Sequence, residues 1–241
     1  MSDHERTPVN IGIAGIRGRM GGAVAAQVEA DPAYRLVGGI VRPGSAVDET
    51  HPLRLEASPE ALLGDIDVLI DVSLPHATAG IANTCASHGT PLVCGVTGLD
   101  DDAMRALRDA SERIPVWYAR NLSHGISVLL GLLPALAAEL VGYDVSIVER
   151  HHRQKRDAPS GTALALARAI TGDDAVGGGG PVDIQSVRAG GITGEHDVTF
   201  TNAFEEIRIG HRALDRAAFA AGAVRATRTI AHAAPGWYGP E

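Results

Sequence analysis

The sequence is poor in cysteine and in aromatic residues, has no excess of basic charge and contains no long uninterrupted apolar run. Two cysteines, Cys85 and Cys94, are too few for a disulfide framework, so we expect free, buried thiols and a cytoplasmic location. Aromatic residues make up 4% of the chain and the net charge is -8, which argues against a nucleic-acid partner. The longest apolar run, 126–141, is interrupted by Pro134 and Glu139 and is shorter than the roughly 20 residues of a membrane span. The N-terminus is polar and shows no secretory signal, so we expect a soluble protein with no membrane partner.

The first half of the sequence alternates short β-branched runs with alanine-rich helical stretches, from residue 9 to about residue 121. Runs such as VNIGIA, DVLIDVS and PLVCGV are apolar almost throughout, which is typical of strands buried on both faces. This pattern predicts a Rossmann-like, doubly wound α/β domain, in which helices cover a parallel sheet. With 241 residues and 45% apolar side chains, the chain has room for this domain and a second, smaller one.

The second half of the sequence has a different pattern. Runs such as YDVSIVER, VDIQSVRAG, EHDVTFTN and EEIRIGHRA alternate apolar with polar residues, and they predict a smaller α+β domain with a mixed, largely antiparallel sheet. Two helices, at 124–141 and 160–171, can cover one face of this sheet, and an apolar surface left on the other would be expected to contact another protein. We interpret the glycine run 177–180 as a flexible loop, and expect a last helix at about 215–232 that stops at the Pro-Gly pair 235–236.

A glycine-rich turn stands between the first predicted strand and the first predicted helix, in the stretch IGIAGIRGRMGGAV. Gly15, Gly18 and Gly21 would let the backbone turn tightly and approach a diphosphate, which the amides of the first helical turn stabilise. Arg17 within the turn faces either phosphate or solvent. The turn therefore indicates a dinucleotide site, with a plain tight turn as the alternative.

The ends of the later strands indicate which nucleotide is bound. The second strand ends with Val41 and Arg42, without the carboxylate that would bind a ribose 2′-hydroxyl, so an arginine–phosphate contact and NADP are favoured over an exposed arginine beside a turn. Gly95 and Asn121 lie at the ends of the fourth and fifth predicted strands, where a doubly wound sheet holds its ligand. They either line a nicotinamide pocket or simply form loops.

Six side chains that can carry positive charge fall within seven residues of the stretch ERHHRQKRDAPSGTA, 149–163, just before a helical run. Ser160 suits an N-cap or an anion contact, the amides of Gly161 and Thr162 would point towards a carboxylate, and Lys155 adds a full charge. This arrangement predicts a site for a small anion. The alternative is a solvated basic loop with an ordinary N-cap serine.

The paired histidines of this stretch are better suited to proton transfer than to metal binding. If 143–150 is a strand, His151 and His152 project to opposite sides, so we expect no metal site. A histidine is the side chain best suited to donate a proton near neutral pH.

The stretch 149–163 resembles the pattern E-x-H-H-x-x-K-x-D-A-P-S-G-T-A of the 4-hydroxy-tetrahydrodipicolinate reductase family, also called dihydrodipicolinate reductases, of the diaminopimelate route to lysine. The stretches GIRGRMG, GVTG, NLS, VRAGGITGEH and FAAGAVRA resemble further motifs of this family, in the same order. The resemblance implies a dinucleotide-binding domain, 1–121, completed by 216–241. It also implies a substrate-binding and oligomerisation domain, 122–215, and a homotetramer.

The resemblance further implies the roles of individual residues. His151 would be the catalytic acid and Lys155 its cationic partner, and the contacts to a cyclic dicarboxylate would come from His152, Ser160, Gly161 and Thr162. The reaction would be reduction with loss of water by NADPH, with NADH also possible. The residues implied to bind this cofactor are Gly15, Ile16, Arg17, Gly18, Arg19, Met20, Arg42, Gly95, Val96, Thr97, Ala119, Asn121 and Leu122.

The sequence leaves two other functions open. One is a different two-domain NADP-dependent dehydrogenase, acting on an acyclic amino-acid precursor, and the other is a non-catalytic NADP-binding sensor. The chain also departs from the family's usual pattern at Val96, at Leu122, in a shortened segment before Val187, and after its last glycine.

Overall fold

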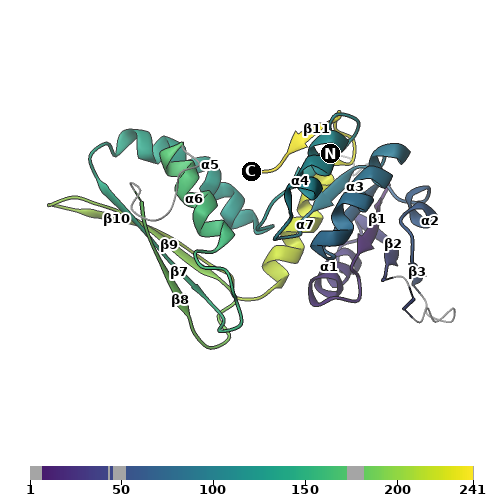
Figure 1. Cartoon of the computed structure of the whole chain (residues 1–241), viewed down its shortest axis with the longest axis horizontal. Coiled ribbons are helices and arrows are strands. Elements are labelled where there is room, and N and C mark those ends of the chain that lie inside the picture. The colour runs from purple at the N-terminus through teal and green to yellow at the C-terminus, as the bar shows by residue number, and fades with distance from the viewer. Residues whose placement is uncertain (1–6, 43, 46–52, 173–181, 241) are drawn as a thin grey trace, which may run out of the picture. The chain divides into compact units, whose positions relative to one another are not determined.

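The computed structural model describes residues 7–42, 44–45, 53–172 and 182–240, which divide into two compact units. The first unit contains the described residues up to Leu122 together with Phe219–Gly239, and the second unit contains Ser123–Ala218 (Figure 1). The glycine run 177–180 lies outside the described residues.

The first unit is built on a seven-stranded sheet with the order β11-β6-β5-β4-β1-β2-β3. Every pair of neighbouring strands in this sheet is parallel, which confirms the Rossmann-like prediction. Its strands are β1 (Val9–Ala14), β2 (Tyr34–Ile40), β3 (Arg54–Glu56), β4 (Val68–Asp71), β5 (Leu92–Cys94), β6 (Pro115–Tyr118) and β11 (Gly236–Tyr238).

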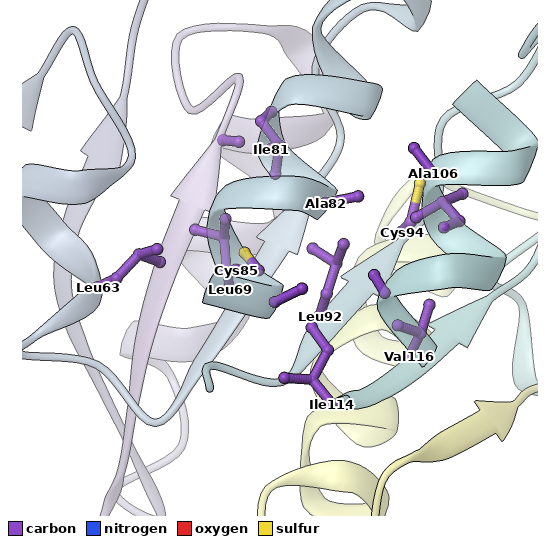
Figure 2. Close-up of a cluster of buried hydrophobic side chains, with 14 of the residues drawn as sticks. Leu63, Leu69, Ile81, Ala82, Cys85, Leu92, Cys94, Ala106, Ile114 and Val116 are labelled. Carbon is purple, nitrogen blue, oxygen red and sulfur yellow. The ribbon is translucent and has the colours of Figure 1, made fainter. Parts of the chain in front are cut away.

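Helices pack on both faces of this sheet, which explains why its strands are apolar almost throughout. The helices are α1 (Arg19–Glu29), α2 (Glu60–Leu63), α3 (Pro75–His88), α4 (Asp101–Ser111) and α7 (Ala217–Ile230). In β4, Leu69 belongs to the core that lies against α3 and α4, whereas Val68 and Ile70 belong to the core that lies against α1 and α7. Figure 2 shows the first of these cores, where Cys85 of α3 and Cys94 of β5 lie among aliphatic side chains. Both cysteines are free and buried, as predicted, and burial raises the pKa of each thiol far above its usual value.

Two strands of the first sheet differ from the sequence-based prediction. Strand β3 was not predicted, because Leu55 is the single apolar residue among its three. Strand β11 begins at Gly236, where the sequence pattern predicts only the end of a helix, and it pairs in parallel with β6 from Pro115 onward. Trp237 of β11 stacks under the Arg108 guanidinium at 3.5 Å and lies 5.7 Å from the ring of Tyr118.

The second unit has a four-stranded sheet with the order β10-β9-β7-β8. Strands β7 and β8 are parallel, whereas β7–β9 and β9–β10 are antiparallel, so the sheet is mixed as predicted. Helices α5 and α6 lie on one side of it (Figure 1). The elements are α5 (His124–Glu139), β7 (Asp144–His151), α6 (Gly161–Thr171), β8 (Val182–Arg188), β9 (Glu195–Thr201) and β10 (Glu206–Arg212).

The two faces of this second sheet differ in polarity. Val198 and Phe200 of β9 are buried in the core formed with α5 and α6. Their neighbours in β9 alternate to the other face, where Glu195 forms ion pairs with Arg150 at 3.9 Å and with Arg212 at 3.0 Å. At these positions the face opposite the helices is therefore polar. It does not carry the apolar surface that, from the sequence, would be expected to contact another protein.

Among the described residues, no helix combines the length and apolar character that crossing a bilayer requires.

Candidate functional site

The turn between β1 and α1 has the backbone geometry of an anion-binding turn. Gly15 has a positive φ of 81°, and the amide of Gly18 donates to the carbonyl oxygen of Gly15 at 2.8 Å. A Cβ on Gly21 would lie only 2.2 Å from that same oxygen, so only glycine fits where α1 crosses the turn. Gly18 caps α1 without a side chain, which leaves the first-turn amides facing outward, where a phosphate can accept from them.

This turn borders a cavity of ≈ 660 Å³, a size typical of sites for small ligands. Four of the predicted cofactor residues line it: Gly15, Arg17, Gly18 and Arg42. The cavity also has polar lining residues that the sequence did not indicate, namely Ser45, Glu60, Ser73, His76 and Thr84. Two arginines and one glutamate are therefore among the residues that line this space.

One wall of the cavity is the turn that follows β4, and a buried carboxyl group holds this turn in place. Asp71 accepts from the backbone amide of Ser73 at 3.0 Å and from the hydroxyl of Thr78 at 2.9 Å. Burial raises the pKa of Asp71, and these hydrogen bonds oppose that shift. Asp71 therefore holds the turn from β4 into α3.

The residues predicted to contact nicotinamide follow β5 and β6, where these strands end at Cys94 and Tyr118. Val96, Ala119 and Leu122 have buried side chains that belong to the core of the first unit. Contacts from these three residues to a ligand would therefore come from their backbone groups. None of the six residues predicted for this role lines the described cavity: Gly95, Val96, Thr97, Ala119, Asn121 and Leu122.

The predicted anion site of the second unit is a loop that leads from β7 into α6. Ser160 is the N-cap of α6, and its hydroxyl accepts from the amide of Ala163 at 3.1 Å. This N-terminus directs the positive end of the α6 dipole towards the loop. The Lys155 ammonium lies in the same loop and donates to Asp157 at 2.8 Å.

His151, the last residue of β7, is held by a buried carboxylate. Its Nδ1 lies 2.5 Å from Oε2 of Glu149, which is fully buried. Arg188 donates to both oxygens of Glu149, at 2.8 Å and 2.6 Å, and the amide of Ser160 donates to Oε1 at 3.2 Å. Burial would raise the pKa of Glu149, but hydrogen bonds from Arg188, Ser186 and His151 outweigh it and hold this pKa at about 2. Glu149 is therefore ionised at neutral pH.

Two further histidines lie near His151. The rings of His151 and His196 meet edge to face at 5.2 Å, and Nε2 of His196 lies 3.1 Å from the hydroxyl of Ser160. Burial lowers the pKa of His196 to about 3, so this ring is neutral. His211 lies beyond it, 6.4 Å from the His196 ring, with Nε2 2.9 Å from the hydroxyl of Ser123.

In the structure, Lys155 and Ser160 thus lie in the loop that joins His151, at the end of β7, to the start of α6. His152 lies in the same loop, and its Nδ1 is buried without a hydrogen-bond partner in the described part of the chain. Reasoning on the sequence missed Glu149, Arg188 and His196, although all three stand inside motifs of the resemblance. Among the described residues, no group of three or more histidine, cysteine, aspartate or glutamate side chains is placed to hold a metal ion.

Two family models match the chain. One, described as "Dihydrodipicolinate reductase, N-terminus", covers residues 9–122, and the other, described as "Dihydrodipicolinate reductase, C-terminus", covers residues 125–241. The 4-hydroxy-tetrahydrodipicolinate reductase of Chromohalobacter salexigens is 40% identical over 95% of both chains, and that of Xanthomonas campestris pv. campestris is 41% identical over 96% of both.

A solved structure supports the same fold. The structure called "Dipicolinate bound Dihydrodipicolinate reductase from Paenisporosarcina sp. TG-14" matches with a TM-score of 0.81 at 22% identity, over 97% of this chain and 98% of that one. A probable dehydrogenase from Thermotoga maritima matches with a TM-score of 0.65 at 12% identity, over 92% of this chain and 87% of that chain.

Proposed function

The chain belongs to the dihydrodipicolinate reductase family, and on this premise we propose how its residues carry out the family's reaction. That reaction is the NAD(P)H-dependent reduction of 4-hydroxy-tetrahydrodipicolinate, with loss of water, in the diaminopimelate route to lysine. We assign the nucleotide to 1–121 together with 216–241, and the substrate to 122–215. Family membership favours this reaction over another dehydrogenase activity and over a non-catalytic sensor. A cytoplasmic location is part of the same proposal.

The glycine turn of the first unit is suited to the diphosphate of a pyridine nucleotide. The positive φ of Gly15 and the uncapped start of α1 support this assignment, because both turn backbone amides towards a bound anion. We assign the turn residues Gly15, Ile16, Arg17, Gly18, Arg19 and Met20 to the diphosphate. When bound, the reduced nicotinamide supplies the hydride, and we assign its contacts to backbone groups after β5 and β6.

NADPH is the proposed cofactor, with NADH accepted more weakly. Arg42 follows β2 and lines the ≈ 660 Å³ cavity, where it can pair with a 2′-phosphate. Arg17 lines the same cavity and adds positive charge. Glu60 opposes them with one carboxylate, so the preference for NADPH is expected to be limited.

The loop between β7 and α6 is the observation that carries the substrate assignment. A dicarboxylate needs cations and amides, and the loop offers Lys155, His152 and the positive end of α6 at Gly161 and Thr162. Ser160 contributes by fixing the start of that helix. The dipicolinate named for the Paenisporosarcina structure supports a small cyclic dicarboxylate as the ligand class.

His151 is the proposed acid. Reduction of the ring adds a proton as well as a hydride, and His151 is a histidine fixed at the edge of the anion loop. We expect His151→Gln to lower turnover by about 10²-fold or more, the usual weight of general acid catalysis. Lys155→Ala should raise KM for the dicarboxylate, with Lys155→Arg intermediate. Consumption of NADPH measures both effects. His88→Gln, on the exposed end of α3, is the matched histidine control, and wild-type kinetics in His151→Gln would contradict the assignment.

The composition of the chain offers a second test of Lys155. It is the only lysine among the 241 residues, so reductive methylation with ¹³C-formaldehyde labels this side chain and the N-terminal amine alone. Dipicolinate, added to the labelled protein, should shift the Lys155 resonance and leave the N-terminal one in place. No shift at saturating dipicolinate would remove Lys155 from the site.

We also propose that 122–215 forms the contacts of a homotetramer, on the strength of the family resemblance. Because the open face of the second sheet carries ion pairs such as Arg212–Glu195 at 3.0 Å, an interface there would rest on polar contacts rather than on apolar burial.

A further inference from the structure

Glu149 is a buried charge that the proposed reaction does not use directly. Its side chain is fully buried in β7, and its two oxygens accept from Arg188, from the amide of Ser160 and from Nδ1 of His151. A buried carboxylate is tolerated when its hydrogen bonds are complete, and here Arg188 neutralises the charge of Glu149 through a bidentate ion pair. The hydrogen bond to His151 determines which nitrogen of that ring carries a proton.

An ionised carboxylate can only accept hydrogen bonds, so Nδ1 of His151 must carry a proton at a separation of 2.5 Å from Oε2 of Glu149. The other ring nitrogen, Nε2, is then the one available to a ligand. Gly194 lies beside it, and a Cβ added there would come within 3.2 Å of Nε2. The glycine therefore avoids placing a side chain against Nε2.

We propose that Glu149 is the positioning residue that sets the proton on His151, by holding Nδ1–H so that the proton given to the substrate leaves from Nε2. This inference rests on the proposed role of His151 as the acid. In the donating state the ring carries protons on both nitrogens. Transfer of the Nε2 proton to the substrate leaves a neutral ring that still donates Nδ1–H to Glu149.

The charges around His151 act in opposite directions on this state. The Glu149 carboxylate favours the doubly protonated ring, whereas Lys155 and Arg188 disfavour it, and His196 beside it is neutral. Burial lowers the pKa of His151, and Glu149 offsets part of that effect. Glu149 is thus the one group among these four that stabilises the protonated acid.

Glu149→Gln tests the proposal. A glutamine oxygen in the place of Oε1 can still accept from Nη2 of Arg188 and from the amide of Ser160, and the amide N–H in the place of Oε2 would then face Nδ1 of His151. The neutral ring would then carry its proton on Nε2. We expect turnover to fall by about 10²-fold or more, with KM for the substrate changed much less. The alkaline limb of kcat/KM should move to lower pH, since the charge that favours the protonated ring is lost. Glu195→Gln, the same change on the neighbouring strand, is the matched control and should leave both values as in wild type.

A double-mutant cycle separates this role from the proposed function. If Glu149 acts through His151, Glu149→Gln combined with His151→Gln should be no slower than His151→Gln alone. An independent further loss in the double variant would overturn the positioning role. Wild-type turnover in His151→Gln would instead overturn the assignment of His151 as the acid.

The proton itself can be observed without turnover. The ¹⁵N resonances of His151 in the ligand-free protein should report Nδ1–H for the neutral ring in wild type and Nε2–H in Glu149→Gln. The same tautomer in both proteins would overturn the proposal. If Glu149→Gln does not fold, Glu149→Asp provides the test, because it keeps the charge. Its turnover should fall, but its pH profile should stay close to that of wild type. A displaced profile in Glu149→Asp, with the charge retained, would count against the proposal.

Discussion

The crossing of α1 over the glycine turn can be tested with two neighbouring glycines. A Cβ on Gly21 would lie 2.2 Å from the carbonyl oxygen of Gly15 and 2.6 Å from Cα of Ile16. Both are backbone atoms, so no side-chain rotation can relieve the overlap. Gly22, the next residue of the same helix, has no atom within 4 Å of such a Cβ. Gly22→Ala is therefore a matched control for Gly21→Ala.

The difference between the two variants isolates the overlap. Each replacement gains about 0.8–1.0 kcal/mol of helix propensity, and this gain cancels in the comparison. Overpacking in a fixed environment typically costs about 1–3 kcal/mol, and contact with backbone puts Gly21→Ala at the upper end of that range. For a protein of this size, a difference at that upper end corresponds to a melting temperature roughly 6–12 °C lower for Gly21→Ala than for Gly22→Ala.

Thermal unfolding followed by circular dichroism measures this difference, and titration with NADPH measures its effect on the site. Displacing the backbone of Gly15 and Ile16 should weaken NADPH binding in Gly21→Ala and leave it unchanged in Gly22→Ala. Equal melting temperatures and equal affinities in the two variants would show that the close approach of α1 to the turn is not present in the folded protein.

Three further predictions concern the cofactor, the assembly and the response to acid. Arg42→Ala should weaken NADPH by about ten- to a hundredfold and NADH much less, and equal affinities for both cofactors in wild type would refute the preference. Sedimentation should give four times the 25.0 kDa chain mass, with dissociation favoured by high salt, and a monomer at micromolar concentration would contradict the tetramer. The pKa of Glu149 falls from 4.5 to about 2 because hydrogen bonds, foremost from Arg188, outweigh its burial. Its stabilising contribution is therefore complete above pH 4.5 and is lost as the pH falls towards 2, so melting temperatures of wild type and Glu149→Gln should converge over that interval.

The nucleotide-binding fold could be predicted because its central strands are buried on two faces. In β4, alternate residues enter opposite cores, so the run VLID is apolar up to its last residue. The strands β3 and β11 carry no comparable pattern, since β3 has one buried residue, Leu55, and the residues of β11 are only partly buried. Strand β11 is held at the sheet edge by its pairing with β6 and by the stacking of Trp237 under Arg108, which are contacts between residues far apart in sequence.

The residues of the candidate site likewise divide into those that the sequence could predict and those that it could not. The N-cap at Ser160 and the start of α6 could be predicted because an N-cap has a local signature, and His151 and Lys155 stand close to them in sequence. Glu149 stands in an alternating strand, where a charged residue is usually interpreted as solvent-facing. Glu149 can be buried because Arg188 donates to both of its oxygens. Arg188 is brought there by the parallel register of β7 and β8, which pairs it with His151 across 37 positions of sequence, and no local pattern contains that register.

This register also determines which cations a substrate can use. Arg188 stands in a motif of the family resemblance and is a natural candidate for a carboxylate contact. Both of its terminal nitrogens, however, donate to Glu149, at 2.8 Å and 2.6 Å, and one of them also donates to the carbonyl oxygen of Asp157 at 2.6 Å. A dicarboxylate that bound these two terminal nitrogens would have to displace a buried carboxylate, which is unfavourable because that carboxylate would be left without its partner. On the proposed assignment, the charge offered to the substrate would be that of Lys155 and the start of α6, and Arg188 would serve to keep Glu149 ionised beside His151.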